Sequence, residues 1–187
     1  MALLETVLAG LWLMLPALIP NSAAVLWGGG TPMDFGRSWR NKRILGDGKT
    51  WRGFFGGSLT GALFGLVILG MSEALGAQAS WGYGSWPESI VTPFALAFGS
   101  LIGDAVGSFV KRRLGVERGA KAPVLDQYNF VLGAVLLSLV ARPGWFLEHY
   151  VHGYGWVALV VFLAAVPLLH RGVNIIGYKM GKKDVPW

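Results

Sequence analysis

One carboxylate stands inside an apolar segment, and a hydroxyl and an amine follow it at helical spacing. Asp104 lies about two turns from a cluster of basic residues, and an ionisable side chain within a membrane segment is costly and usually functional. Ser108 and Lys111 come four and seven residues later, so all three share one face of a helix that turns by about 100° per residue. This face is suited to a metal ion or a phosphate group. A buried ion pair between Asp104 and a basic residue of another helix is the structural alternative.

A second carboxylate, Asp126, stands at the predicted start of the next helix, after a basic loop that contains Gly and Pro. Taken alone, an Asp at this position is typical of a helix N-cap. Two carboxylates that flank a basic loop, however, also suit Mg²⁺, while the cations hold phosphate groups. Asp104 and Asp126 are therefore candidate ligands of one metal ion, with the N-cap role still open for Asp126.

The segment Gly46-Asp47-Gly48-Lys49-Thr50-Trp51-Arg52 combines a turn signal with the predicted start of a helix. The backbone N–H groups and the dipole of a helix N-terminus favour an anion, so Lys49, Thr50 and Arg52 predict phosphate binding there. A basic loop that rests on anionic headgroups explains the general charge but not this arrangement. The segment is not a P-loop, because Arg43 stands where that motif has Gly.

Membrane helices must position these residues. Of the 187 residues, 53% are hydrophobic and 14% are charged, whereas soluble domains carry about 25% charged residues. We predict an all-α bundle of five transmembrane helices that forms a single domain over residues 1–187. The predicted helices cover about 2–20 with an extension to 27, 53–76, 90–110, 126–146 and 154–171, because a span needs about 20 apolar residues. No Lys or Arg precedes the first helix, which disfavours a signal peptide.

The basic residues predict the orientation in the membrane. All but one of the 16 Lys and Arg residues fall in the loops 28–52 and 111–125 and in the segment from Arg171 to the C-terminus, which includes the tail 172–187. Five spans place these segments on one face, and the positive-inside rule makes that face cytoplasmic, with the N-terminus outside and the C-terminus inside. An aromatic belt is predicted at the outer interface, formed by Trp81, Tyr83, Trp86, Trp145, Tyr150, Tyr154 and Trp156.

Two series of glycines recur every four residues and predict close packing between helices. They are Gly53, Gly57, Gly61 and Gly65 in one segment and Gly99, Gly103 and Gly107 in another. The chain has no cysteine, which excludes disulfides, thiolate catalysis and cysteine-ligated metal centres.

Together these motifs resemble the CTP-dependent phosphatidate cytidylyltransferases. The segment from Lys49 to Phe54 is similar to the Lys-Thr-Trp-Glu-Gly segment of that family, and Asp126 resembles its later metal-binding Asp. Gly103-Asp104, Ser108 and Lys111-Arg112 resemble its signature. The archaeal branch, the CDP-archaeol synthases, is similar over nearly the whole chain. It shares Pro32-Met33-Asp34-Phe35-Gly36, Gly46-Asp47-Gly48-Lys49-Thr50, Pro123 followed by Asp126-Gln127, and the tail residues His170, Asn174, Gly181 and Pro186-Trp187.

The differences from the bacterial members point the same way. The bacterial Pro-Gly-His-Gly-Gly run is absent, Gln127 stands where those members have Arg, and the chain is much shorter. These departures favour the archaeal branch and its ether-lipid substrate.

The resemblance implies transfer of the CMP moiety of CTP to an isoprenoid glycerol-ether lipid phosphate, at the cytoplasmic side of the plasma membrane. It implies Mg²⁺ at Asp104 and Asp126, with Lys49 and Lys111 completing the catalytic set. Asp34 and Asp47 would serve a second metal position or orient the cations. The expected substrate-binding residues are Asn21, Asp34, Asp47, Thr50, Arg52, Ser108, Arg112, Gln127, His170 and Asn174. The expected partners are CTP, the lipid phosphate and the bilayer, with no nucleic acid, and the oligomeric state stays open.

Other functions compete with this one. A CTP-using polyprenol or lipid kinase has similar needs but transfers the γ-phosphate. A small ion-coupled transporter would use Asp104 as its ion site, although the polar residues crowd one end of the predicted bundle. A CDP-alcohol phosphotransferase is disfavoured because its array of Asp residues is missing.

Overall fold

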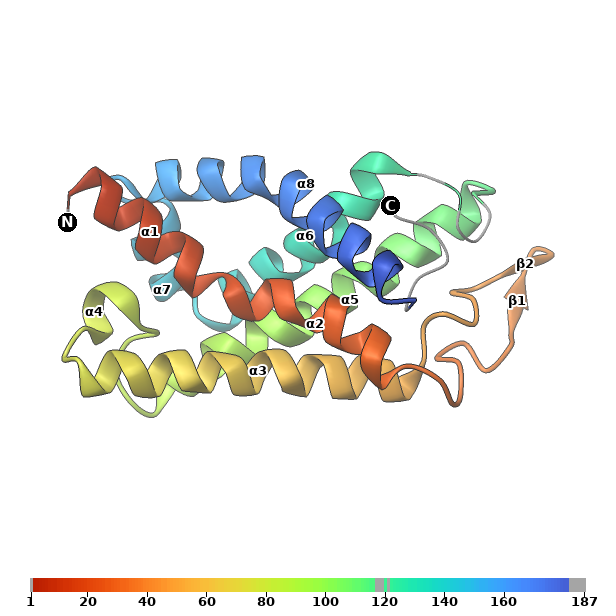
Figure 1. Ribbon diagram of the computed structural model, residues 1–187, viewed down its shortest axis with the longest axis horizontal. Coiled ribbons are helices and arrows are strands. Elements are labelled where there is room, and N and C mark those ends of the chain that lie inside the picture. The colour runs from red at the N-terminus through yellow and green to blue at the C-terminus, as the bar shows by residue number, and fades with distance from the viewer. Residues whose placement is uncertain (1, 117–119, 121, 182–187) are drawn as a thin grey trace.

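The computed structural model describes residues 2–116, 120 and 122–181, and its regular structure is almost entirely helical (Figure 1). The helices are α1 (Leu3–Leu13), α2 (Leu15–Trp27), α3 (Trp51–Ala74), α4 (Gln78–Trp81), the 3-10 helix η1 (Glu88–Ile90), α5 (Val91–Arg113), α6 (Pro123–Ala141), α7 (Pro143–Tyr150) and α8 (Gly155–Lys179). Two short strands, β1 (Ser38–Trp39) and β2 (Lys42–Arg43), pair antiparallel. The predicted features at Arg118, Lys121, Lys182, Lys183 and Pro186-Trp187 lie outside the described residues.

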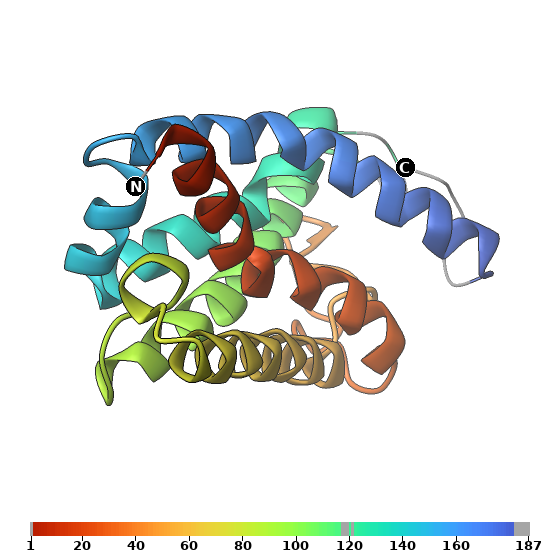
Figure 2. The ribbon, with the colours of Figure 1, turned by 60° about the vertical axis from the view of Figure 1, so that its left-hand side comes forward.

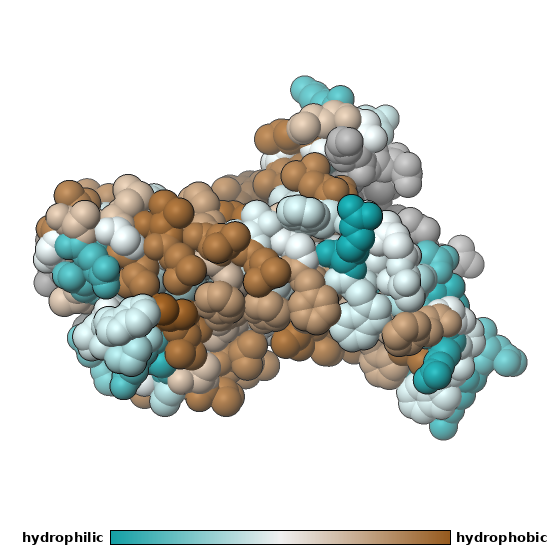
Figure 3. All heavy atoms as spheres, turned by 90° about the horizontal axis from the view of Figure 1, so that it is seen from below, coloured by the Kyte–Doolittle hydropathy of each residue, from teal (hydrophilic) through white to brown (hydrophobic). Residues whose placement is uncertain are grey.

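Five candidate membrane spans run along the long axis, as the sequence predicts. Among the described residues, the helical stretches Leu3–Trp27, Trp51–Ala74, Glu88–Arg113, Val124–Ala141 and Gly155–Lys179 are long and apolar enough to cross a bilayer. Figure 3 shows a broad hydrophobic surface over the middle of the molecule, with hydrophilic residues gathered at both ends. The loop with β1 and β2, the end of α5 and the end of α8 lie toward the same end (Figure 1).

Prolines divide two of the predicted helices. Pro16 has no N–H to donate to the carbonyl four residues earlier, and the first span is divided into α1 and α2 at Met14. The Tyr83 hydroxyl donates to the Leu13 carbonyl at 3.3 Å beside this break. Pro143 similarly disfavours helical backbone at Arg142, so the predicted helix 126–146 instead becomes α6 and α7.

Three aromatic residues of the predicted outer belt lie in the core. Tyr83, Trp145 and Tyr150 are buried, and the Tyr150 hydroxyl donates to the Gly10 carbonyl at 2.8 Å. Each has a polar group that finds a backbone acceptor, which permits burial. Trp86, Tyr154 and Trp156 are exposed, so only part of the predicted belt is available to an interface.

The glycine series allow the close packing that their spacing predicts. A Cβ added at Gly61 would lie 2.6 Å from the ring of Pro20, so α3 presents small residues to the prolines of α2. On α5, a Cβ at Gly103 would lie 2.2 Å from the Asn129 carbonyl oxygen and 2.9 Å from Gly133 Cα of α6. Backbone therefore lies against backbone at the α5–α6 contact. Figure 2 shows α8 on the far side of the bundle from α3.

The basic loop forms a small β-hairpin that the all-α prediction did not include. Arg40 and Asn41 form its tip with positive φ angles of 51° and 59°, and Ser38 pairs with Arg43. Two consecutive residues with positive φ match the twist of paired strands. The predicted loop 111–125 is shorter than expected, because α5 continues to Arg113 and α6 begins at Pro123. The predicted tail from 172 is helical as far as Lys179.

Candidate active site between two cavities

Two adjoining cavities occupy the charged end of the bundle. The first, of about 330 Å³, lies among α2, α3, α5, α6 and α8 and is lined by Asp104 and Asp126; we call it the carboxylate cavity. The second, of about 550 Å³, lies between the hairpin loop and the end of α5; we call it the cationic cavity. Its basic lining residues are Lys42, Arg43, Lys49, Lys111 and Arg112. Gly48 and Lys49 line both cavities.

Lys49 forms an ion pair with Asp104 that joins the loop to α5. The Lys49 Nζ contacts Asp104 Oδ2, and both side chains remain partly exposed, at 29% and 20%. Lys49 stands just before the N-terminus of α3, where the buried Thr50 hydroxyl is the N-cap and accepts from the Gly53 N–H at 3.1 Å. The structural alternative, a buried pair that joins Asp104 to another helix, is met only in part: Asp104 pairs with a lysine, but the lysine comes from a loop, and the pair is partly exposed and borders a cavity.

Lys111 forms a second ion pair, with Asp126. The Lys111 Nζ lies 2.6 Å from Asp126 Oδ1, which joins the last turn of α5 to the first turn of α6. Asp126 is not the N-cap, which is Ala122; instead its Oδ2 accepts from the Ala122 N–H at 2.8 Å. Each pair joins a lysine of the cationic cavity to a carboxylate of the carboxylate cavity.

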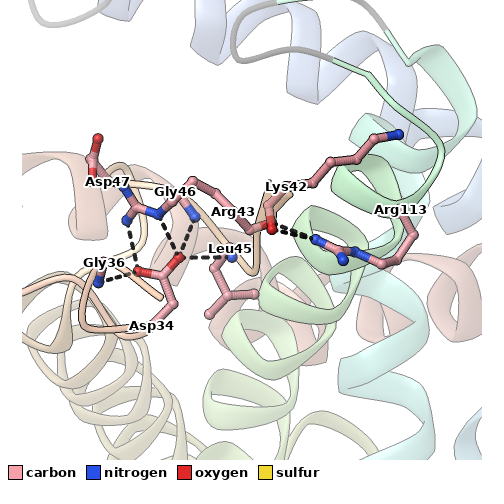
Figure 4. Close-up of polar contacts among 8 residues, drawn as sticks. All are labelled: Asp34, Gly36, Lys42, Arg43, Leu45, Gly46, Asp47 and Arg113. Carbon is pink, nitrogen blue, oxygen red and sulfur yellow. Dashed lines mark hydrogen bonds and ion pairs between the residues drawn. The ribbon is translucent and has the colours of Figure 1, made fainter. Parts of the chain in front are cut away.

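Asp34 organises the hairpin loop and does not line either cavity. Figure 4 shows its carboxylate surrounded by donors from the loop. It accepts from both Arg43 Nε and Nη2, at 3.2 and 2.7 Å, and from three backbone N–H groups, at Gly36, Leu45 and Gly46. The Arg43 guanidinium holds the pKa of Asp34 well below its usual range, and the backbone donors act in the same direction. Of the two expected roles of Asp34, this geometry fits the orienting of cations, since a metal ion would have to displace those donors.

Asp47 lies on the other side of Arg43. Its Oδ1 is 2.7 Å from Arg43 Nη1, and its side chain is exposed and borders the cationic cavity. Arg43 therefore connects Asp34 and Asp47, and the hydrogen bonds that it donates to Asp34 raise the pKa of Arg43 further above its usual range.

Three other expected residues line the carboxylate cavity or contact its lining. Asn21 borders it from α2 and donates to the Ser100 hydroxyl at 3.2 Å. His170 borders it from α8 and stacks on Phe130, with ring centroids 6.4 Å apart. The buried Asn174 side-chain nitrogen lies 3.3 Å from His170 Nδ1. Helix α8 thus contributes His170 to the wall of this cavity, with Asn174 beside it.

The remaining expected residues are spread around the site. Ser108 is buried and lines the cationic cavity, as does Arg112, which also donates to the Val116 carbonyl. Gln127 is partly exposed beside Asp126, and Arg52 is exposed at the start of α3. The predicted shared face of α5 is therefore divided, with Asp104 at one cavity and Ser108 and Lys111 at the other.

The carboxylate cavity has ligands that fit Mg²⁺. No group of three or more His, Asp or Glu residues with metal-binding geometry occurs within the described ranges. Mg²⁺ does not need one, because it commonly binds one or two carboxylates and completes its shell with water and substrate phosphates. Asp104 and Asp126 on one cavity are such a set, although Lys49 and Lys111 contact them in this structure.

Three residues near the site were not singled out by the sequence. Arg43 and Arg113 stabilise the hairpin loop through hydrogen bonds. A run of basic residues in the sequence does not reveal which of them make contacts within the protein. Asn129 is buried three residues after Asp126, and its Nδ2 has no hydrogen-bond partner in the part of the chain that the structure describes. Asn129 packs against Gly103 and Gly107 of α5, a position that could be inferred only once α5 and α6 were known to pack together.

Comparison with known proteins identifies the family. A family model described as CarS-like CDP-archaeol synthase matches residues 3–187. The CDP-archaeol synthase of Methanocorpusculum labreanum is 46% identical, over 93% of this chain and 100% of the relative. That of Archaeoglobus fulgidus is 43% identical, over 99% of this chain and 100% of the relative. A solved structure of an intramembrane enzyme for archaeal membrane lipid biosynthesis is 38% identical, with a TM-score of 0.68 over 90% of this chain and 94% of that chain. The chain therefore belongs to the CDP-archaeol synthase family.

Proposed function

We propose that this protein transfers the CMP moiety of CTP to an isoprenoid glycerol-ether lipid phosphate, giving CDP-archaeol in its unsaturated form and pyrophosphate. The observation that carries the proposal is the pair of Lys–Asp contacts at the junction of the two cavities. A cationic cavity between the hairpin loop and the end of α5 suits a soluble triphosphate. A cavity among membrane helices suits a phosphate attached to a lipid. Their junction is where the two phosphates would meet.

The reaction needs charge screening more than proton transfer. The attacking phosphate monoester has a second pKa of about 6, so it is already ionised at neutral pH. One of its oxygens forms a bond to the α-phosphorus of CTP, and the bond from that phosphorus to the β-phosphate oxygen breaks, with the electron pair leaving on pyrophosphate. Two polyanions must approach each other, so positioning and electrostatic stabilisation carry most of the catalysis.

The basic residues are distributed to match these needs. Lys49 and Lys111 stand at the junction and would contact the reacting phosphates, while Lys42 and Arg112 would neutralise the departing pyrophosphate. Asp104 and Asp126 would hold Mg²⁺, which when bound neutralises phosphate charge and aligns the CTP phosphates. Lys49 and Lys111 contact these carboxylates in this structure and would turn to the substrate phosphates when the substrates are bound.

The charged end of the bundle is proposed to be cytoplasmic. The concentration of Lys and Arg at that end supports this orientation under the positive-inside rule, and CTP is then available on the same side. A lipid phosphate in the inner leaflet would reach the carboxylate cavity from among the spans, whose walls at this level include the apolar residues Val25, Leu101 and Phe130.

The decisive experiment follows the label of CTP. Purified protein in detergent is incubated with Mg²⁺, the lipid phosphate, and CTP labelled at either the α- or the γ-phosphate. Transfer of the α-label to lipid, with release of labelled pyrophosphate from γ-labelled CTP, is expected. Transfer of the γ-label to lipid would instead identify a CTP-dependent kinase. Activity that survives exhaustive chelation of divalent metal would remove the metal role of Asp104 and Asp126.

A separate experiment tests the orientation. Single cysteines introduced at Ala2 and at Gly181 are labelled in intact cells by a reagent that does not cross membranes, against the cysteine-free background. The residue-2 cysteine is expected to react and the residue-181 cysteine to be protected until the cells are opened. Equal labelling of both would contradict an odd number of spans.

A further inference from the structure

Arg113, which follows Lys111 and Arg112 in the last turn of α5, contacts the hairpin loop and lines neither cavity. Its Nη1 donates to the Trp39 carbonyl at 2.5 Å, and its Nη2 donates to the carbonyls of Lys42 and Arg43 at 3.0 and 2.7 Å. One side chain therefore binds three carbonyls that lie about 70 positions away in the sequence. Figure 4 shows the guanidinium directed at the strand that carries Lys42 and Arg43.

Aromatic contacts add to this interaction. The rings of Trp39 and Phe109 are stacked, with centroids 6.0 Å apart and an interplanar angle of 10°. The Arg113 guanidinium carbon lies 5.2 Å from the Trp39 centroid and 5.4 Å from that of Phe109. Both distances lie within the range of cation–π attraction. Loop and helix are thus joined by a hydrogen-bonded and stacked contact.

The backbone that Arg113 holds carries side chains of the cationic cavity. Lys42 and Arg43 line that cavity, and their own carbonyls are the ones that Arg113 binds. Arg43 in turn binds Asp34 and Asp47, and Asp34 accepts from the Leu45 and Gly46 N–H groups just before Lys49. A continuous set of contacts therefore leads from Arg113 through the hairpin to the cavity wall.

We infer that Arg113 is a positioning residue, which fixes the hairpin on α5 so that the loop completes the cationic wall of the nucleotide site. The inference rests on the proposed function, since it assumes that the cationic cavity receives CTP. Only arginine offers a planar fork with enough donors for three acceptors; a lysine in its place keeps the charge but loses the fork. If the hairpin is displaced from α5 in some of the molecules, only the docked fraction can bind CTP. The apparent Kd for CTP is then the intrinsic Kd divided by that fraction.

The matched test compares Arg113→Lys with Arg37→Lys, which makes the same change on an exposed side chain of the same loop. For Arg113→Lys we expect KM for CTP to rise about tenfold, as the loss of one hydrogen bond to a charged group would give. We expect kcat and the KM for the lipid phosphate to stay within about twofold of the wild-type values. The reason is that saturating CTP binds the docked hairpin and shifts the molecules to that state. Arg37→Lys should match the wild-type protein.

Limited trypsin digestion gives a readout that does not depend on turnover. Trypsin has targets at Arg37, Arg40, Lys42 and Arg43 in the hairpin. Arg113→Lys should be cut there faster than either the wild-type or the Arg37→Lys protein, and CTP with Mg²⁺ should slow the cut.

Each outcome decides between the possibilities. A fall in kcat with unchanged KM for CTP would mean fewer folded molecules and a merely structural role, which overturns the inference. An unchanged KM and an unchanged cleavage rate would overturn it as well. A wild-type protein that forms no CDP-lipid would remove the proposed function, while faster cleavage of Arg113→Lys would still show that Arg113 holds the hairpin.

Discussion

The contact between α5 and α6 sets the relation between the two carboxylates, and a single methyl group tests it. Gly103 immediately precedes Asp104, and Asn129 of α6 follows Asp126 by three residues. In Gly103→Ala the new Cβ would stand 2.2 Å from the Asn129 carbonyl oxygen, where ordinary contact begins at 3.4 Å. The two helices must therefore separate by about 1 Å, because a backbone atom cannot move aside as a side chain can.

This displacement has consequences for stability and for rate. Overpacking of this kind costs about 1–3 kcal/mol, against a gain of about 0.5–1 kcal/mol from replacing a helical glycine with alanine. A misplacement of about 1 Å between reacting groups lowers the rate about 100-fold, which corresponds to about 2.7 kcal/mol in the activation barrier. The loss of activity should therefore exceed what the loss of stability explains.

The assay measures kcat/KM for CDP-lipid formation beside the thermal midpoint in detergent. Gly70→Ala is the control, because no atom beyond the neighbouring helix backbone lies within 4 Å of its added Cβ, and it should be fully active and at least as stable. Gly99→Ala disturbs the same contact one turn further from Asp104, 2.6 Å from the Gly133 carbonyl oxygen, so it should lose similar stability but less activity. Normal activity and stability in Gly103→Ala would refute the close α5–α6 contact and the argument built on it.

Further substitutions separate the roles of the site residues. Asp104→Asn keeps the shape and loses the charge, so it should lower kcat at least about 100-fold with a nearly unchanged thermal midpoint; early melting would instead assign Asp104 to structural pairing with Lys49. Lys49→Met should raise KM for CTP and keep the dependence on Mg²⁺, and an unchanged KM would remove Lys49 from the phosphate site. Asp34→Asn should lower the thermal midpoint at pH 7. Because the folded pKa of Asp34 lies below its unfolded value of about 3.9, this stabilisation is complete above that pH and lost as the pH falls further. The gap between wild-type and Asp34→Asn midpoints should therefore narrow below about pH 4, and a gap that stays constant would contradict the assignment.

The sequence alone determined the number of spans and the end of the bundle that carries the charge. Both follow from composition, since apolar length and the clustering of Lys and Arg are properties of contiguous segments. The glycine spacing likewise predicted close helix contacts, because small residues four apart lie on one helix face. The predictions of the helix ends were less accurate. Pro16 and Pro143 divide two of the predicted helices, and α8 continues beyond its predicted end to Lys179.

Only the tertiary structure decided which charges meet. The sequence placed Asp104, Ser108 and Lys111 on one face, but their partners come from other elements, and the ion pairs join Lys49 to Asp104 and Lys111 to Asp126. The sequence could not distinguish Asp34 from the site residues, because its role depends on the hairpin that surrounds it. It could not distinguish Arg113 from Arg112 either, because only the structure shows the loop packed against α5. The physical reason is that a motif records residue type and spacing, whereas an ion pair depends on the distance between segments that are far apart in the chain. That distance is set by the packing of helices, which for α5 and α6 is set by glycines facing backbone.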